Sequence, residues 1–132
     1  MTLIEKNREM IIHHYIKKSY QAIDDAETLL GKRSFTGALN RIYYGIFYIL
    51  SALAVKNKFS TLKHSQLIGW FNKNYVKSEK VDRKIGRIIH NAFDQRMESD
   101  YDPLSEFHYE EIEENLANMK KVISSIEKLV KG

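Results

Sequence analysis

The sequence predicts an all-α protein, and three observations support this prediction. Apolar residues recur at spacings of three and four in each long segment of the 132-residue chain, the period of an α-helix. The chain contains one proline, Pro103, so long helices can run without interruption. The connections between the periodic segments are short, which favours antiparallel neighbours. We therefore expect one domain, residues 1–132, folded as an up-down bundle of four long helices and one short helix.

The first two helices are the clearest in the sequence. Residues 3–30 are expected to form the first helix, with Gly31 as its C-terminal stop. The second helix is expected over 35–56, with Ser34 as its N-cap and Asn57 ending it in a left-handed conformation. Because this second segment is apolar on nearly all sides, we expect the other helices to surround it.

Three further helices follow at shorter intervals. A short helix is expected from about residue 63 to 76, a fourth from about 81 to 99 and a fifth from about 109 to 130. The fourth helix is expected to stop before Pro103, because the residue before a proline disfavours helix.

Composition and charge exclude several classes of function. A formal net charge of +4 permits contact with nucleic acid without arguing for it. The absence of cysteine excludes thiolate metal sites and fits the cytoplasm. We find no glycine-rich phosphate loop and no histidine–carboxylate metal motif, so neither a cofactor nor a metal is expected. No uncharged apolar run is long enough for a membrane span, and the charged N-terminus lacks the apolar segment of a signal peptide.

Two polar residues stand inside the apolar second helix, Asn40 and Arg41. A charged side chain is costly there unless it is paired or reaches water. Two interpretations are open. Arg41 extends to the end of the bundle and pairs with a carboxylate, or both side chains point into a site. We predict that Arg41 and Tyr44 lie close to residues 96–101 at the end of the fourth helix, with Asp100 as the partner of Arg41.

A second polar group closes the fourth helix. Arg96 and Asp100 are four residues apart and could pair on one helix face, while Tyr101 follows directly. Two interpretations are again open: an ion pair and a turn that close the helix, or an arginine, an acid and a phenol that together bind phosphate.

Three short motifs carry a family resemblance. Ala38–Tyr44, read as A-L-N-R-I-Y-Y, resembles the A-x-N-R-x-Y-Y signature of one subgroup of HEPN domains. Lys63-His64-Ser65 resembles the start of that subgroup's third helix, and Arg96–Tyr101 resembles its R-x-x-A/S-D-Y turn. The motifs occur in the family's order and on the expected helices.

The resemblance implies a helical bundle that forms a homodimer. It also implies a toxin-like, metal-independent ribonuclease, encoded beside a minimal nucleotidyltransferase that acts as its antitoxin. RNA or a nucleotide would be the ligand. The family's R-x4-6-H motif would place its arginine on Arg96, where it would stabilise phosphate while the histidine serves as acid or base.

This sequence departs from that motif at one position. Tyr101 stands where the histidine belongs, and a phenol with an ordinary pKa near 10 is a poor general base at neutral pH. The candidate catalytic residues are therefore Arg96 and Tyr101. The candidate residues for binding phosphate or a nucleotide are Asn40, Arg41, Tyr44, His64 and Asp100.

Two other arginine–histidine pairs match the spacing elsewhere in the chain. Arg8 with His13 and Arg83 with His90 fit R-x4-6-H, but neither pair lies at the family's position, and pairing on a helix surface explains both. Three functions remain open: a HEPN protein that acts on RNA, a non-catalytic helper subunit that partners a nucleotidyltransferase, and a helical dimer without a ligand site.

Overall fold

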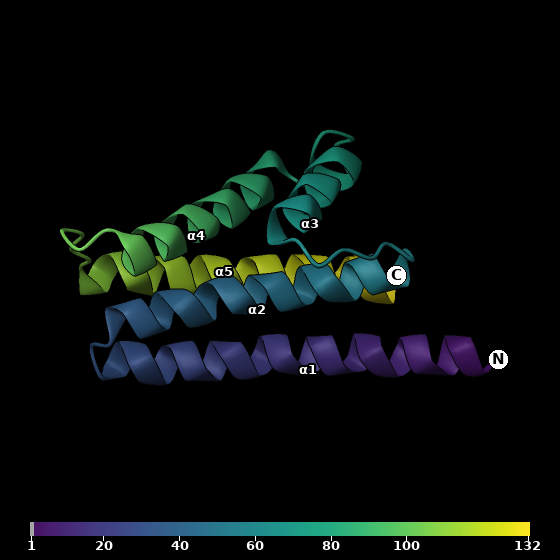
Figure 1. Ribbon diagram of the computed structural model, residues 1–132, viewed down its shortest axis with the longest axis horizontal. Helices are drawn as coiled ribbons and strands as arrows, with labels where there is room; N and C mark the ends of the chain where they lie inside the picture. Colours follow the sequence, from purple (N-terminus) through teal and green to yellow (C-terminus); the bar gives the residue numbers. More distant parts are fainter. Residues whose placement is uncertain (1) are drawn as a thin grey trace.

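The computed structural model describes residues 2–132, and it contains only helices, turns and loops over that range (Figure 1). The elements are α1 (Leu3–Gly31), α2 (Phe35–Lys56), α3 (His64–Phe71), the π-helical turn η1 (Asn72–Val76), α4 (Arg83–Tyr101) and α5 (Tyr109–Lys131). The all-α prediction and the plan of four long helices with one short helix are confirmed.

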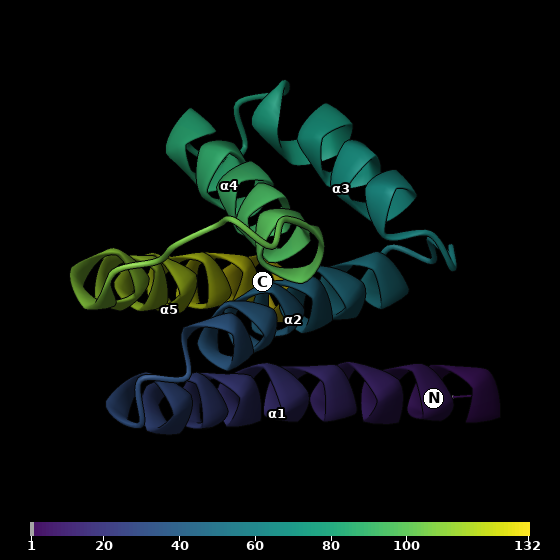
Figure 2. The ribbon, with the colours of Figure 1, turned by 60° about the vertical axis from the view of Figure 1, so that its left-hand side comes forward.

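Helix α2 lies at the centre of the bundle. It contacts each of the other four α-helices, while α1 also packs against α5. In both views α3 and α4 lie on the side of α2 away from α1 (Figures 1 and 2). Helices α1 and α4 run opposite to α2 and α5, which is the up-down arrangement that the short connections predict.

The core is formed around α2. Its buried apolar side chains face those of α5 and α1, and many are inaccessible to solvent. Gly45 marks the closest approach: a Cβ atom there would collide with Met119 Cε of α5 and lie 3.1 Å from Ala22 Cβ of α1. Three helices therefore meet at one glycine, where a larger residue has no room.

Helix α2 is also the one helix within residues 2–132 with the length and composition of a membrane span. Its most apolar stretch has a mean hydropathy of 1.3, although the sequence led us to expect no such run. Of that stretch, 67% is buried inside the bundle. The helices packed around α2 account for its apolar composition.

The structure corrects two local expectations at helix ends. Ser34 precedes α2 as its N-cap, but its side chain makes no capping hydrogen bond. The left-handed residue after α2 is Lys58, with a φ of 59°, while Asn57 has a φ of −91°. Asn57 instead donates its side-chain amide to the Leu53 carbonyl at 2.8 Å. This bond satisfies a carbonyl at the C-terminal end of α2 although the Asn57 backbone is not left-handed. After α1, the left-handed residue is Arg33.

The expected helix over 63–76 divides into α3 and the π-helical turn η1. The wider turn is closed by a bond from the Lys77 amide to the Asn72 carbonyl at 2.8 Å. In this arrangement Phe71 is fully buried and Tyr75 stacks on it, with ring centroids 5.4 Å apart. The packing of these two rings accompanies a change of helix type that periodicity alone does not reveal.

Candidate functional site

The helices α2, α3 and α4 bring five side chains together, which we call the Arg96 cluster: Arg41, Tyr43, Tyr44, His64 and Arg96. The Arg96 guanidinium carbon lies 5.0 Å from the ring centroid of Tyr43 and 5.2 Å from that of Tyr44. The Arg41 guanidinium lies 5.3 Å from the same Tyr44 ring. Tyr44 thus contacts two cations, each attracted by the negative face of an aromatic ring.

Arg96 is poorly neutralised for an arginine in this position. Its side chain is 20% exposed, and its Nε atom lies 3.5 Å from Asp100 Oδ2, at the limit of hydrogen-bond distance. Within the described chain, Arg96 Nε and Ser99 Oγ are the buried side-chain polar atoms that lack a hydrogen-bond partner. The contact with Asp100 is thus long, and the Arg96 guanidinium keeps a positive charge that can attract an anion.

His64 lies beside these rings at the start of α3. Its Nδ1 atom is 2.8 Å from the Tyr43 hydroxyl, and its ring centroid is 4.0 Å from that of Phe47. Burial, and secondarily the positive charge of Arg96, lower the pKa of His64 below its usual value of 6.5. The imidazole is therefore mainly neutral at pH 7.

Tyr43 remains protonated throughout the physiological range. It is 1% exposed, and burial raises the pKa of Tyr43 to about 12, although Arg96 opposes this rise. The direction of its hydrogen bond sets the role of the other imidazole nitrogen. When Tyr43 donates to Nδ1, Nε2 of His64 carries a proton that it can donate. When Nδ1 donates to Tyr43, Nε2 has a lone pair that can accept a proton.

The structure brings Tyr44, Arg41 and Arg96 together, as we expected, but it pairs the charges differently. Arg41 donates through Nε and Nη2 to Asn40 Oδ1, at 3.1 and 2.8 Å. No ion pair joins Arg41 to Asp100 in the part of the chain that the structure describes, so that expectation is wrong. Asp100 lies one helical turn from Arg96, and this local partner takes precedence over one on another helix.

Tyr101 is separate from the cluster. Its side chain is 73% exposed and makes no hydrogen bond within residues 2–132. The histidine that shares the Tyr43 and Tyr44 rings with Arg96 is supplied by α3. We did not single out Tyr43 or Phe47 from the sequence. Their spacing of four places them on one helix face, but only the fold shows that His64 packs against that face.

The remaining histidines show no metal site. Within residues 2–132, no three histidine or acidic side chains gather closely enough to hold a metal ion. His90 pairs with Asp94 at 3.2 Å, one turn along α4. Arg8 and His13 both line a cavity of about 470 Å³ beside the end of α5.

Comparison with known proteins identifies the family. Residues 12–129 match the HEPN domain family. A UPF0332 protein of Thermotoga maritima is 34% identical over 123 residues, which cover 93% of each chain. A protein of Methanocaldococcus jannaschii named "Putative toxin MJ0142" is 27% identical over 86% of this chain and 77% of its own. The match covers nearly the whole described bundle and includes all three motifs. The chain therefore belongs to the HEPN domain family.

Proposed function

We propose that this HEPN protein acts on RNA as a toxin-like protein, with the Arg96 cluster as the place where a phosphodiester binds. One observation carries the proposal: Arg96 is held on two tyrosine rings, and its Nε atom makes no hydrogen bond, with Asp100 Oδ2 3.5 Å away. An arginine fixed in this way loses little conformational freedom when an anion arrives. Its fork of donors also matches phosphate oxygens.

His64 supplies the chemistry that the sequence motif lacks. In the proposed reaction the RNA 2′-oxygen forms a bond to phosphorus, and the bond from phosphorus to the 5′-oxygen breaks. One proton leaves the 2′-hydroxyl and one arrives at the 5′-oxygen, and an imidazole can serve either transfer. Arg96 stabilises the charge that develops on the phosphate oxygens. Arg41, which donates to Asn40 and lies over Tyr44, would contact the adjoining phosphate of the RNA backbone.

The proposed assembly is a homodimer in the cytoplasm. Met97, Tyr101 and Leu104 are 38%, 73% and 87% exposed, so apolar surface lies just after Arg96. A second copy that covers this surface would bring two Arg96 clusters close together and bury apolar area. The name of the Methanocaldococcus jannaschii relative supports a toxin-like role, and an antitoxin of the nucleotidyltransferase class is the partner we propose.

A second candidate function is a non-catalytic helper subunit. The exposed phenol of Tyr101, at the position where the family motif has histidine, favours this alternative. A helper subunit would bind RNA or its partner protein through Arg96 without cleaving RNA.

Purified protein incubated with short RNAs, in the presence of a metal chelator, separates these functions. We expect cleavage by the parent and a large loss of both cleavage and binding in Arg96→Ala. His64→Gln should lose cleavage while it keeps most of the binding.

The matched control is Arg33→Ala, because Arg33 also lies over a tyrosine ring, that of Tyr109, at 5.1 Å. Binding without cleavage by the parent would support the helper subunit. Equal behaviour of the Arg96 and Arg33 variants would refute the proposed site.

A further inference from the structure

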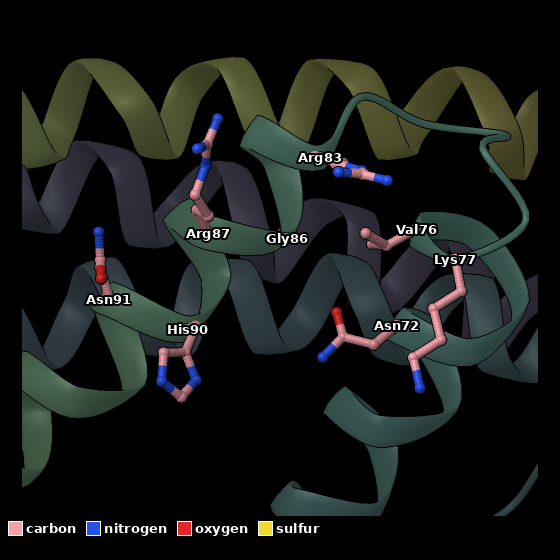
Figure 3. A pocket seen from close by; sticks show the side chains of 8 residues that line it. All are labelled: Asn72, Val76, Lys77, Arg83, Gly86, Arg87, His90 and Asn91. Carbon is pink, nitrogen blue, oxygen red and sulfur yellow. The ribbon is translucent and has the colours of Figure 1, made fainter.

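A second polar site lies at the other end of α4. A cavity of about 600 Å³ opens between the first half of α4 and the turn η1 (Figure 3). Its polar lining comes from Asn72, Lys77, Arg83, Arg87, His90 and Asn91. The volume falls within the range of small-molecule sites, roughly 300–1,000 Å³.

The lining is cationic and is not neutralised. Within the described residues, no salt bridge involves Lys77, Arg83 or Arg87, and no acidic residue lines the cavity. The nearby acid Asp94 pairs with His90 at 3.2 Å. Three unpaired cations around one cavity create a positive potential that favours an anion.

The π-helical turn shapes one wall of this cavity. It presents Asn72 and Val76 to α4, and Figure 3 shows both on the wall that carries Lys77, across from Gly86. A Cβ atom on Gly86 would lie 3.1 and 3.2 Å from the two methyl carbons of Val76. The glycine therefore permits a close approach of α4 and η1, and the contact surface there is apolar. Such turns occur frequently at functional sites.

This cavity is distinct from the Arg96 cluster. Arg87 and Arg96 are nine residues apart, which on an α-helix corresponds to a rise of about 13–14 Å and to opposite faces. A phosphate bound by Arg96 therefore cannot also contact the cavity cations.

We propose that the cavity binds a small phosphate-bearing molecule with an apolar or planar body. Arg83 and Arg87, one turn apart on α4, bind the phosphate, since guanidinium groups are among its usual partners. The body lies against the exposed side of the Val76 side chain, which lines the cavity. The side-chain amides of Asn72 and Asn91 provide hydrogen-bond donors and acceptors at the rim of the cavity, and these would recognise polar groups at the edge of the ligand's body.

Calorimetric titration of the full chain tests the proposal with four probes: AMP, pyrophosphate, adenosine and a ten-nucleotide RNA. We expect AMP and pyrophosphate to bind and adenosine to bind at least tenfold more weakly than AMP. The variant Arg83→Gln/Arg87→Gln should weaken AMP binding by about a hundredfold or more, because each charge-assisted hydrogen bond contributes roughly tenfold or more. Arg33→Ala, which touches neither the cavity nor the Arg96 cluster, should leave AMP binding unchanged.

The matched control is Lys73→Gln/Lys84→Gln. It removes two exposed charges from the same two elements without touching the cavity lining. An equal loss of AMP binding in this control would show that general charge, not the cavity, attracts the ligand, and would overturn the proposal. The absence of AMP and pyrophosphate binding by the parent would overturn it as well, whether or not the RNA binds. Equal affinity for adenosine and AMP would also overturn it. The outcomes with AMP, pyrophosphate and adenosine do not bear on RNA binding at Arg96, which the RNA titration measures separately.

Discussion

Replacing Arg96 with alanine should lower the free energy of unfolding by about 1–3 kcal/mol. The two guanidinium–tyrosine contacts, at 5.0 and 5.2 Å, contribute roughly 0.5–2 kcal/mol each in a partly buried setting. The ion pair with Asp100 adds only about 0.5 kcal/mol, because both side chains retain solvent access. Removal of the unpartnered Nε donor offsets about 1 kcal/mol of the loss.

The same substitution should raise the pKa of His64. Its pKa is lowered chiefly by burial and secondarily by the charge of Arg96, so removal of that charge returns part of the shift. Urea denaturation at pH 7 measures the stability change, and a proton NMR titration of the imidazole measures the pKa.

The control is Arg33→Ala, which removes a single guanidinium–tyrosine contact at 5.1 Å on another part of the bundle. It should cost about 0.5–1 kcal/mol and leave the pKa of His64 unchanged. If both variants lose the same stability and neither moves the pKa of His64, then Arg96, its tyrosines and His64 do not act as one electrostatic unit.

Three further predictions concern the bundle and its titrating groups. Gly45→Val should destabilise the protein by about 2 kcal/mol or more through overpacking, whereas Gly69→Val, where nothing lies within 4 Å of the added Cβ atom, should change the urea midpoint little. The pKa of His64 is lower in the folded protein, so on acidification the unfolded chain binds the proton first, and the free energy of unfolding falls as the pH drops below 6.5. A pH series of urea midpoints should therefore show a smaller loss of stability at acid pH in His64→Gln than in the parent. The Tyr20 hydroxyl donates to Glu127, and this bond is the main cause that raises the pKa of Tyr20 to about 12 and lowers that of Glu127. Tyr20→Phe should therefore cost about 0.5–1 kcal/mol at pH 7 and abolish the stability loss from this group between pH 10 and 12; a parent whose midpoints do not fall in that range would contradict the assignment.

Much of the fold follows from local pattern. Helix α2 begins and ends where the apolar run predicts, and the other long helices agree within one or two residues at each end. The π-helical turn η1 is different, because it accompanies the packing of Phe71 and Tyr75 rather than following from any sequence period. Periodicity specifies which face of a helix is buried, but the position of the aromatic rings that pack against that face depends on the whole fold.

The candidate site was predictable only in part. The sequence placed Arg41 and Tyr44 near Arg96, because a charged Arg41 in an apolar helix needs a partner and the family resemblance brings the end of the fourth helix close. It assigned the wrong partner to Arg41, since a neighbouring amide on the same helix competes with a distant carboxylate. The contact of His64 with Tyr43 joins residues 21 positions apart, and no local pattern encodes it.

The central claim is that RNA phosphate binds beside Arg96 and His64, and one measurement tests it most directly. The pKa of His64 should be determined by NMR with and without a saturating, non-cleavable RNA that carries 2′-methoxy groups. A phosphate within about 4–6 Å favours the charged imidazole, so bound RNA should raise the pKa of His64 by about one unit or more. RNA that binds elsewhere on the protein, with the pKa of His64 unchanged, would contradict the claim.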